Sequence, residues 1–191
     1  AVGGGGLIAG ISAYIKAKKP DIKIIGVEPI DSASMKEALL IGKPVRLDTV
    51  GIFADAVAVN QVGEETLKLC KMFVDEIITV DNDQICAGIK DIYEDTRSIV
   101  EPAGALAIAG LKKYITSKET KNEKFIVVNC GANVNFDRLQ HIAERTAIGE
   151  EKEVLLAVEI PEIPGSFRKF CKALSQRNIT EFNYRYKDTN K

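Results

Sequence analysis

Residues 2–11 read VGGGGLIAGI and carry the strongest indication of how this chain folds. Four glycines separate an apolar stub ending at Val2 from small and apolar residues at helical spacing, which run from Leu7 to Lys18. A strand end, a glycine turn and a helix in this order let several backbone N–H groups converge on an anion, aided by the helix dipole. A plain strand-to-helix turn or a flexible linker is the alternative, but a linker is rarely followed at once by such an apolar run. We therefore favour phosphate binding, although the stretch matches neither the dinucleotide fingerprint nor the P-loop.

Short apolar strands and helices alternate along the rest of the chain. We predict strands at residues 23–27, 76–80 and 125–129, and helices at residues 7–18, 34–41, 61–74, 83–93 and 103–114. The strands are continuous apolar runs, which is typical of parallel strands buried on both faces. Asp81 is expected to cap the helix that follows it. The pattern predicts an α/β fold with a mainly parallel sheet.

A charged stretch at residues 149–153 predicts a linker. We therefore expect one domain over residues 1–149 and the start of a second over residues 150–191. The second part shows one βαβ arm, with strands at residues 154–160 and 179–186 around a helix at residues 167–176. We expect this arm to be the opening of a longer domain, and Ala1-Val2 to be the end of a strand that begins upstream.

Composition excludes several classes of function. Hydrophobic residues make up 46% and charged residues 28% of the chain, and the net charge is −1. This balance gives no electrostatic basis for binding nucleic acid or a membrane surface. No apolar run approaches the roughly 18–20 residues that a membrane span needs. The four cysteines fit no metal spacing, and the single histidine, His141, is expected to be structural.

Two further residues are candidates for chemistry. Cys130 follows an apolar strand, and in open α/β sheets ligands bind at the carboxyl ends of strands. A thiol there can hydrogen-bond a heteroaromatic nitrogen, although a buried, inert cysteine is the commoner outcome. Glu101 stands just before a helix, where simple charge–dipole stabilisation is the plainer explanation.

The order of these blocks resembles a known family. VGGGGLIAGI, GVEP, FADAVAV, DEIITVD, EPAGALAIAG and NCGANVNFDRL resemble successive blocks of the biosynthetic threonine dehydratases, within the serine/threonine dehydratase group of pyridoxal-phosphate enzymes. The tail, EVLLAVEIPEIPGSFRKFC and ITEFNYRY, resembles the start of that family's ACT-like regulatory domain. Essentially the whole chain is covered by the resemblance.

The resemblance implies a partial tryptophan-synthase-β-like (fold-type II) sheet with helices on both faces, and pyridoxal 5′-phosphate as cofactor. The family converts L-threonine to 2-oxobutanoate and ammonia on the route to isoleucine. By resemblance, the backbone of the glycine loop holds the cofactor phosphate, and Cys130 faces the pyridine nitrogen. A neutral partner there makes the ring a weaker electron sink, which favours elimination of the β-hydroxyl. The expected cofactor-binding residues are Gly3, Gly4, Gly5, Gly6, Leu7, Ala56, Glu101, Cys130 and Asn133.

Three departures from the family pattern qualify this picture. Ala56 stands where the family has glycine. Ser34 stands where related racemases have the second acid of a divalent site, so no divalent metal is predicted and Glu28 is a candidate ligand only of a monovalent ion or water. The family's Schiff-base lysine lies upstream of the glycine loop, so no catalytic residue is assigned within this chain. We therefore expect these 191 residues alone to be inactive.

The resemblance also implies regulation by isoleucine, with valine as its antagonist, a homotetramer, and a location in the cytoplasm or, in a eukaryote, in a plastid or mitochondrion. The expected effector residues are Gly165, Ser166, Phe182 and Tyr184. Ordinary core packing is the alternative for the two aromatic residues. Two other functions stay open: an L-serine dehydratase or serine racemase relative, and a non-catalytic remnant that binds an effector or anion.

Overall fold

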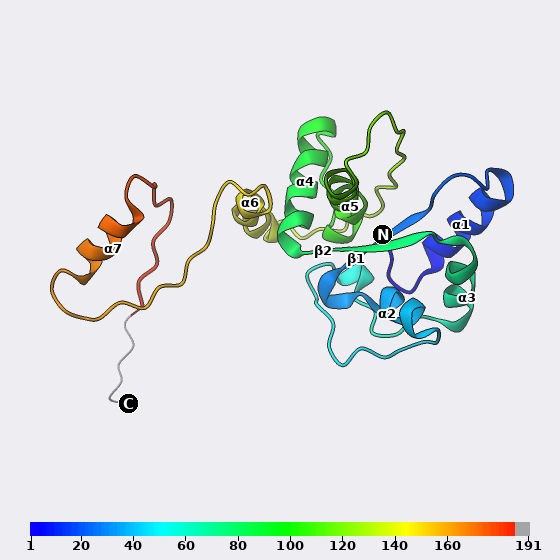
Figure 1. Ribbon diagram of the computed structural model, residues 1–191, viewed down its shortest axis with the longest axis horizontal. Coiled ribbons are helices and arrows are strands. Elements are labelled where there is room, and N and C mark those ends of the chain that lie inside the picture. The colour runs from blue at the N-terminus through cyan, green and yellow to red at the C-terminus, as the bar shows by residue number, and fades with distance from the viewer. Residues whose placement is uncertain (186–191) are drawn as a thin grey trace. The chain divides into compact units, whose positions relative to one another are not determined.

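The structure is a computed structural model that describes residues 1–185. Within residues 1–154, helices surround a short parallel sheet (Figure 1). In chain order they are α1 (Gly6–Lys18), β1 (Ile25–Pro29), η1 (Ile30–Ser32), α2 (Ser34–Ile41), η2 (Asp55–Val57), α3 (Glu64–Phe73), β2 (Glu76–Val80), α4 (Asn82–Thr96), α5 (Pro102–Lys118), α6 (Arg138–Gly149) and α7 (Ser166–Leu174).

The sheet consists of β1 and β2, which pair in parallel with Val27 opposite Ile78. Val2 donates its backbone N–H to Val27 O at 2.9 Å, so the apolar stub before the glycine loop lies against β1. This bond fixes the start of the glycine loop at the sheet.

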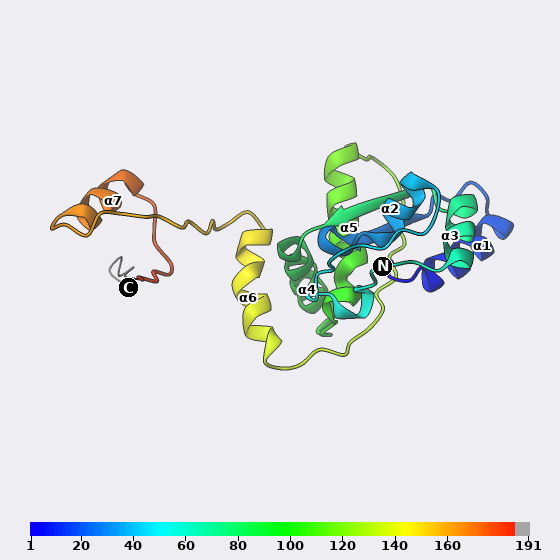
Figure 2. The ribbon, with the colours of Figure 1, turned by 90° about the horizontal axis from the view of Figure 1, so that it is seen from below.

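Helices cover both faces of this sheet, because successive side chains of a strand point to opposite faces. Val27, Ile78 and Val80 pack into a core cluster with α4 and α5. Ile77 packs instead against a second cluster built from α1, α2 and α3. Figures 1 and 2 show α4 and α5 on one side of the strands and α2 on the other. The expected α/β fold with a parallel sheet and helices on both faces is confirmed.

Most of the helices and two of the strands expected from sequence are present, with shifts of a few residues at their ends. β2 and α2 have the predicted bounds. The expected cap of α4 is a capping box: Asp81 Oδ1 accepts from Gln84 N at 2.8 Å, and Gln84 Oε1 accepts from Asp81 N at 3.1 Å. These elements form as predicted because their determining contacts lie within a few residues of one another.

The strand prediction for residues 125–129 is wrong for the described structure. This segment has no strand assignment, and Ile126 is 91% exposed. Within residues 1–185 the only strand ladder joins β1 to β2. A continuous apolar run predicts a strand only where a neighbouring strand accepts its hydrogen bonds, and no such neighbour meets this segment.

The chain divides into a first compact unit, residues 1–154, and a second that begins at Leu155. The boundary expected between residues 149 and 150 stays a prediction. In the second unit, the strands predicted at residues 154–160 and 179–185 are absent, and Leu155 is 81% exposed. Tyr186, the end of the second predicted strand, lies outside the described residues. The helix is present as α7, and Phe167 on it stacks against Phe182 with ring centroids 4.9 Å apart.

Candidate functional site

A pocket of about 300 Å³ opens where the glycine loop, η2, the start of α5 and residues 130–131 meet. This volume is at the lower end of the range for small-molecule sites. It brings together segments separated by about one hundred residues of sequence. Its lining residues are Ala1, Gly3, Gly4, Gly5, Gly6, Leu7, Ala56, Val57, Glu101, Ala103, Cys130 and Gly131.

The glycine loop supplies free backbone donors to this pocket. Gly5, at φ +89°, precedes α1 and its carbonyl accepts the N–H of Ala9 at 2.9 Å. The N–H groups of the first turn have no acceptor within the helix, and that turn has no acidic residue. Thr66 Oγ1 donates to Gly4 O at 2.7 Å and holds the loop in place. The loop is therefore a preformed anion-binding site.

Gly4 and Gly6 border open space. A Cβ added at either position would meet no heavy atom within 4 Å. At Gly5 an added Cβ would instead lie 2.4 Å from Met35 Cε, so this residue is packed from behind. The loop thus keeps one side against the core and presents its other side to the pocket.

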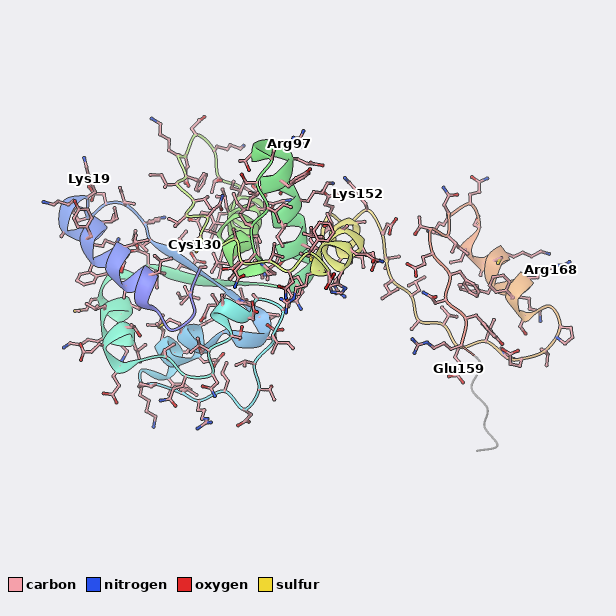
Figure 3. All side chains as sticks on the ribbon, turned by 180° about the vertical axis from the view of Figure 1, so that it is seen from behind. Lys19, Arg97, Cys130, Lys152, Glu159 and Arg168 are labelled. Atoms are coloured by element: carbon pink, nitrogen blue, oxygen red, sulfur yellow. The ribbon has the colours of Figure 1, made fainter. Side chains whose placement is uncertain are left out.

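Glu101 and Cys130 form a second wall of the pocket through close backbone packing. Glu101 N donates to Gly131 O at 3.2 Å, and a Cβ at Gly104 would lie 2.6 Å from Cys130 O. The start of α5 can approach residues 130–131 this closely only because position 104 has no side chain. Glu101 is 9% exposed, so its carboxylate is nearly enclosed beside the pocket. Figure 3 labels Cys130 within the first unit.

The third wall is the loop that contains η2. Ala56 and Val57 line the pocket, and a Cβ added at Gly3 would lie 3.1 Å from Val57 Cα. Ala56 is exposed where it lines the pocket, and its N–H donates to Asp55 Oδ1 at 3.1 Å. The methyl group that distinguishes this position from the family's glycine therefore stands at the edge of the site.

The structure gathers eight of the nine expected cofactor residues at this one pocket and leaves out Asn133. Asn133 is exposed and lies three residues beyond Cys130, so its assignment stays a prediction. Sequence reasoning did not single out Ala1, Val57, Ala103 or Gly131, which also line the pocket. Each lies within two residues of an expected residue, and that proximity was the only signal that could have found them.

Glu28 lies outside this pocket, at the end of β1. Its carboxylate is fully buried and accepts the backbone N–H groups of Met35 and Lys36, both at 2.9 Å. Burial raises the pKa of Glu28 to about 7, against the opposing effect of these two hydrogen bonds. Among residues 1–185 no group of three or more His, Cys, Asp or Glu side chains is placed to hold a metal ion.

The expected effector residues lie in the second unit. Gly165, at φ +95°, precedes α7, and Ser166 is the first residue of that helix. Phe182 reaches the same end of α7 through its contact with Phe167. The hydroxyl of Tyr184 donates to Glu162 Oε1. Whether these residues bind an effector stays a prediction.

Substitution of Gly131 by alanine is expected to distort the second wall. Gly131 has φ +95°, and an added Cβ would lie 1.8 Å from Glu101 Oε1. Backbone strain and the forced displacement of the nearly enclosed Glu101 side chain together should lower the free energy of unfolding by about 2–3 kcal/mol. Gly42→Ala is the matched control, because Gly42 has φ +85° but its nearest neighbour to an added Cβ is 3.8 Å away. The control should lose only about 1 kcal/mol in urea denaturation; equal losses would show that the clash with Glu101 is unimportant.

Comparison with known proteins agrees with this geometry. Residues 1–131 match the family model for pyridoxal-phosphate dependent enzymes, and residues 144–191 match the model for the C-terminal regulatory domain of threonine dehydratase. The chain therefore belongs to the family of pyridoxal-phosphate-dependent enzymes.

Within that family the chain is similar to biosynthetic threonine dehydratases. It is 52% identical to L-threonine dehydratase biosynthetic IlvA of Burkholderia multivorans and 54% identical to IlvA of Escherichia coli, in each case over 98% of this chain. It spans 37% and 36% of the length of those relatives. Among solved structures, the processed form of threonine deaminase isoform 2 from Solanum lycopersicum aligns with a TM-score of 0.76 and 45% identity, covering 77% of this chain and 40% of that one.

The pocket fits the cofactor that this family uses. The acid-free start of α1 and the open backbone at Gly4 and Gly6 suit a dianionic phosphate. The opposite wall offers Cys130, a thiol of the kind that can hydrogen-bond a pyridine nitrogen.

Proposed function

We propose that the complete gene product containing this chain is a pyridoxal-phosphate-dependent lyase that deaminates L-threonine to 2-oxobutanoate and ammonia. The observation that carries the proposal is the single pocket that unites the glycine loop, Glu101 and Cys130. The identity to threonine dehydratases over nearly the whole chain supports the choice of substrate. Because the chain spans about a third of those relatives, the activity is assigned to the complete protein.

In this proposal the residues of the chain bind and orient the cofactor. The N–H groups of Gly4 to Leu7 hold the phosphate, and Thr66 keeps the loop in its binding shape. Cys130 offers a neutral hydrogen-bonding partner to the pyridine nitrogen, and Glu101 closes the site from water beside it. When bound, the cofactor supplies an electron sink for elimination of the substrate's hydroxyl. A neutral partner at its nitrogen favours that elimination over slower reactions of a long-lived carbanion.

We further propose that the second unit belongs to a regulatory domain that binds isoleucine as inhibitor and valine as antagonist, around Gly165, Ser166, Phe182 and Tyr184. The match of residues 144–191 to the regulatory domain of threonine dehydratase supports an amino-acid effector. The same match disfavours a serine racemase or small serine dehydratase, which usually lack this domain. A homotetramer in the cytoplasm, or in a plastid or mitochondrion of a eukaryote, completes the proposal. No helix among the described residues is long and apolar enough to cross a membrane.

The test is turnover by the complete gene product, reconstituted with pyridoxal 5′-phosphate. L-Threonine should yield 2-oxobutanoate, and Cys130→Ser should keep most of the activity because a hydroxyl is also a neutral partner. Cys130→Asp should lower kcat at least about 100-fold, since a carboxylate favours a charged pyridinium. Serine turnover without threonine turnover would contradict the proposed substrate, and an unimpaired Cys130→Asp variant would contradict the role of Cys130.

A further inference from the structure

Helix α6 is fastened to the loop that forms the third wall of the pocket. Arg138, the first residue of α6, donates from Nη1 to Phe53 O at 3.2 Å. One turn later, the His141 ring meets the Phe53 ring edge to face, with centroids 6.1 Å apart. Phe53 is thus held by α6 through both its backbone and its side chain.

The loop connects Phe53 to the pocket over only a few residues. Ala56 and Val57, three and four residues beyond Phe53, line the pocket. The intervening residues have little conformational freedom, because Val57 N donates to Ala54 O at 3.0 Å within η2 and Ala54 is buried. Val57 in turn touches the glycine loop at Gly3. A displacement of Phe53 therefore changes the wall that faces the cofactor phosphate.

The other end of α6 reaches into the regulatory segment. The regulatory family match begins at residue 144, in the middle of α6, so the second half of this helix belongs to the regulatory match while its first residue contacts the pocket loop. The charged stretch after α6, expected to be a linker, is folded back onto the helix. Its N–H groups bond carbonyls of the last turn: Glu150 to Thr146, Glu151 to Ile148, and both Lys152 and Glu153 to Ala147. Figure 3 shows Lys152 beside the end of α6.

Side chains strengthen this connection. Glu150 is paired with Lys90 of α4 at 2.7 Å and with Lys152 at 2.8 Å. These hydrogen bonds lower the pKa of Glu150 to about 2, so the pairing persists at neutral pH. Arg145, elsewhere on α6, is paired with Asp83 at the start of α4 and holds neither residues 150–153 nor the pocket loop. Residues 150–153 are therefore fixed to the end of α6. A movement of the chain beyond residue 153 is passed directly to this helix.

We propose that α6 is the element through which the regulatory domain controls the cofactor pocket, with Arg138 and His141 as positioning residues that act on the pocket through Phe53. A rigid helix that two sites both bias is the physical requirement for such coupling. The inference rests on the proposed function, because the controlled site is the cofactor pocket described above.

The test compares two arginines of the same helix in the complete gene product. Arg138→Met removes the bond to the loop, whereas Arg145→Met removes a bond to α4 and leaves the loop untouched. Arg138→Lys is the conservative variant, and His141→Ala is a second probe at an exposed position. Two quantities are measured with and without L-isoleucine: the threonine concentration for half-maximal velocity, and the fluorescence of bound pyridoxal phosphate.

We expect the isoleucine-induced rise in half-saturating threonine to shrink at least about fivefold in Arg138→Met, within the usual range of allosteric coupling. Arg145→Met should stay within about twofold of wild type, and Arg138→Lys should recover most of the response. Unchanged coupling in both Arg138→Met and His141→Ala, or equal losses in Arg138→Met and Arg145→Met, would overturn the inference. So would wild-type cofactor fluorescence that does not respond to isoleucine. Failure of wild type to deaminate threonine sinks the proposed function instead, and the fluorescence readout still tests α6.

Discussion

Gly6→Asp is expected to abolish cofactor binding without unfolding the protein. Gly6 is the first residue of α1, and an added side chain there enters open space at the pocket. A carboxylate at this point would enter the proposed phosphate site and repel the phosphate, since like charges brought together at a binding site cost several kcal/mol. We expect pyridoxal phosphate to bind at least about 100-fold more weakly, measured by fluorescence titration.

The fold should survive this change, because an acid in the first turn of a helix interacts favourably with its dipole. Gly10→Asp is the matched control: Gly10 lies on the same helix, also has open space at its Cβ position, and does not line the pocket. It should bind the cofactor within about threefold of wild type. Wild-type affinity in Gly6→Asp would show that the glycine loop does not hold the phosphate.

Glu28→Ala is expected to destabilise the first unit strongly. The substitution leaves the buried N–H of Met35 and the partly buried N–H of Lys36 without their acceptor, and it removes a fully buried side chain. Each buried donor left unpaired costs about 1–3 kcal/mol, so the free energy of unfolding should fall by about 3 kcal/mol or more. Glu64→Gln, at an exposed acid in the first turn of α3, should change it by less than about 0.5 kcal/mol in the same urea denaturation.

The pH dependence of stability provides a sharper test of Glu28. Its pKa in the folded protein is raised from 4.5 to about 7, so the native state binds more protons than the unfolded state between these values. The stability that this group contributes is then fully present below pH 4.5 and is lost as pH rises through about 7, by about 3 kcal/mol. Glu28→Gln does not ionise, so its contribution should be flat over this window. An unchanged pH slope in Glu28→Gln would show that this carboxyl is not the titrating group.

The two predictions depend on different levels of structure. The role of Gly6 could be read from VGGGGLIAGI, because a strand end, a glycine turn and a helix start are adjacent in sequence. Glu28 was assigned from sequence only as a candidate ligand of a monovalent ion or water. Its actual partners, Met35 and Lys36, are seven and eight residues away, across a turn and η1.

The predicted strands also show that a feature set by distant partners cannot be read from local sequence. Residues 125–129 form a more apolar run than residues 76–80, but only the latter segment pairs, with β1, about fifty residues earlier in the chain. Helices were predicted more reliably because their hydrogen bonds join residues four apart. A strand exists only when a distant segment satisfies its backbone.

Local patterns in the sequence were enough to predict the glycine loop, the helices, the two paired strands and the capping of α4, and the family resemblance identified Glu101 and Cys130. Packing of distant segments brought these two residues into one pocket with the loop, left Asn133 outside it, and joined the pocket wall to α6 through Phe53. The reason is physical. Caps, turns and helices are fixed by interactions within a few residues, whereas pocket walls and the contacts between them depend on side chains that meet only after the core has packed.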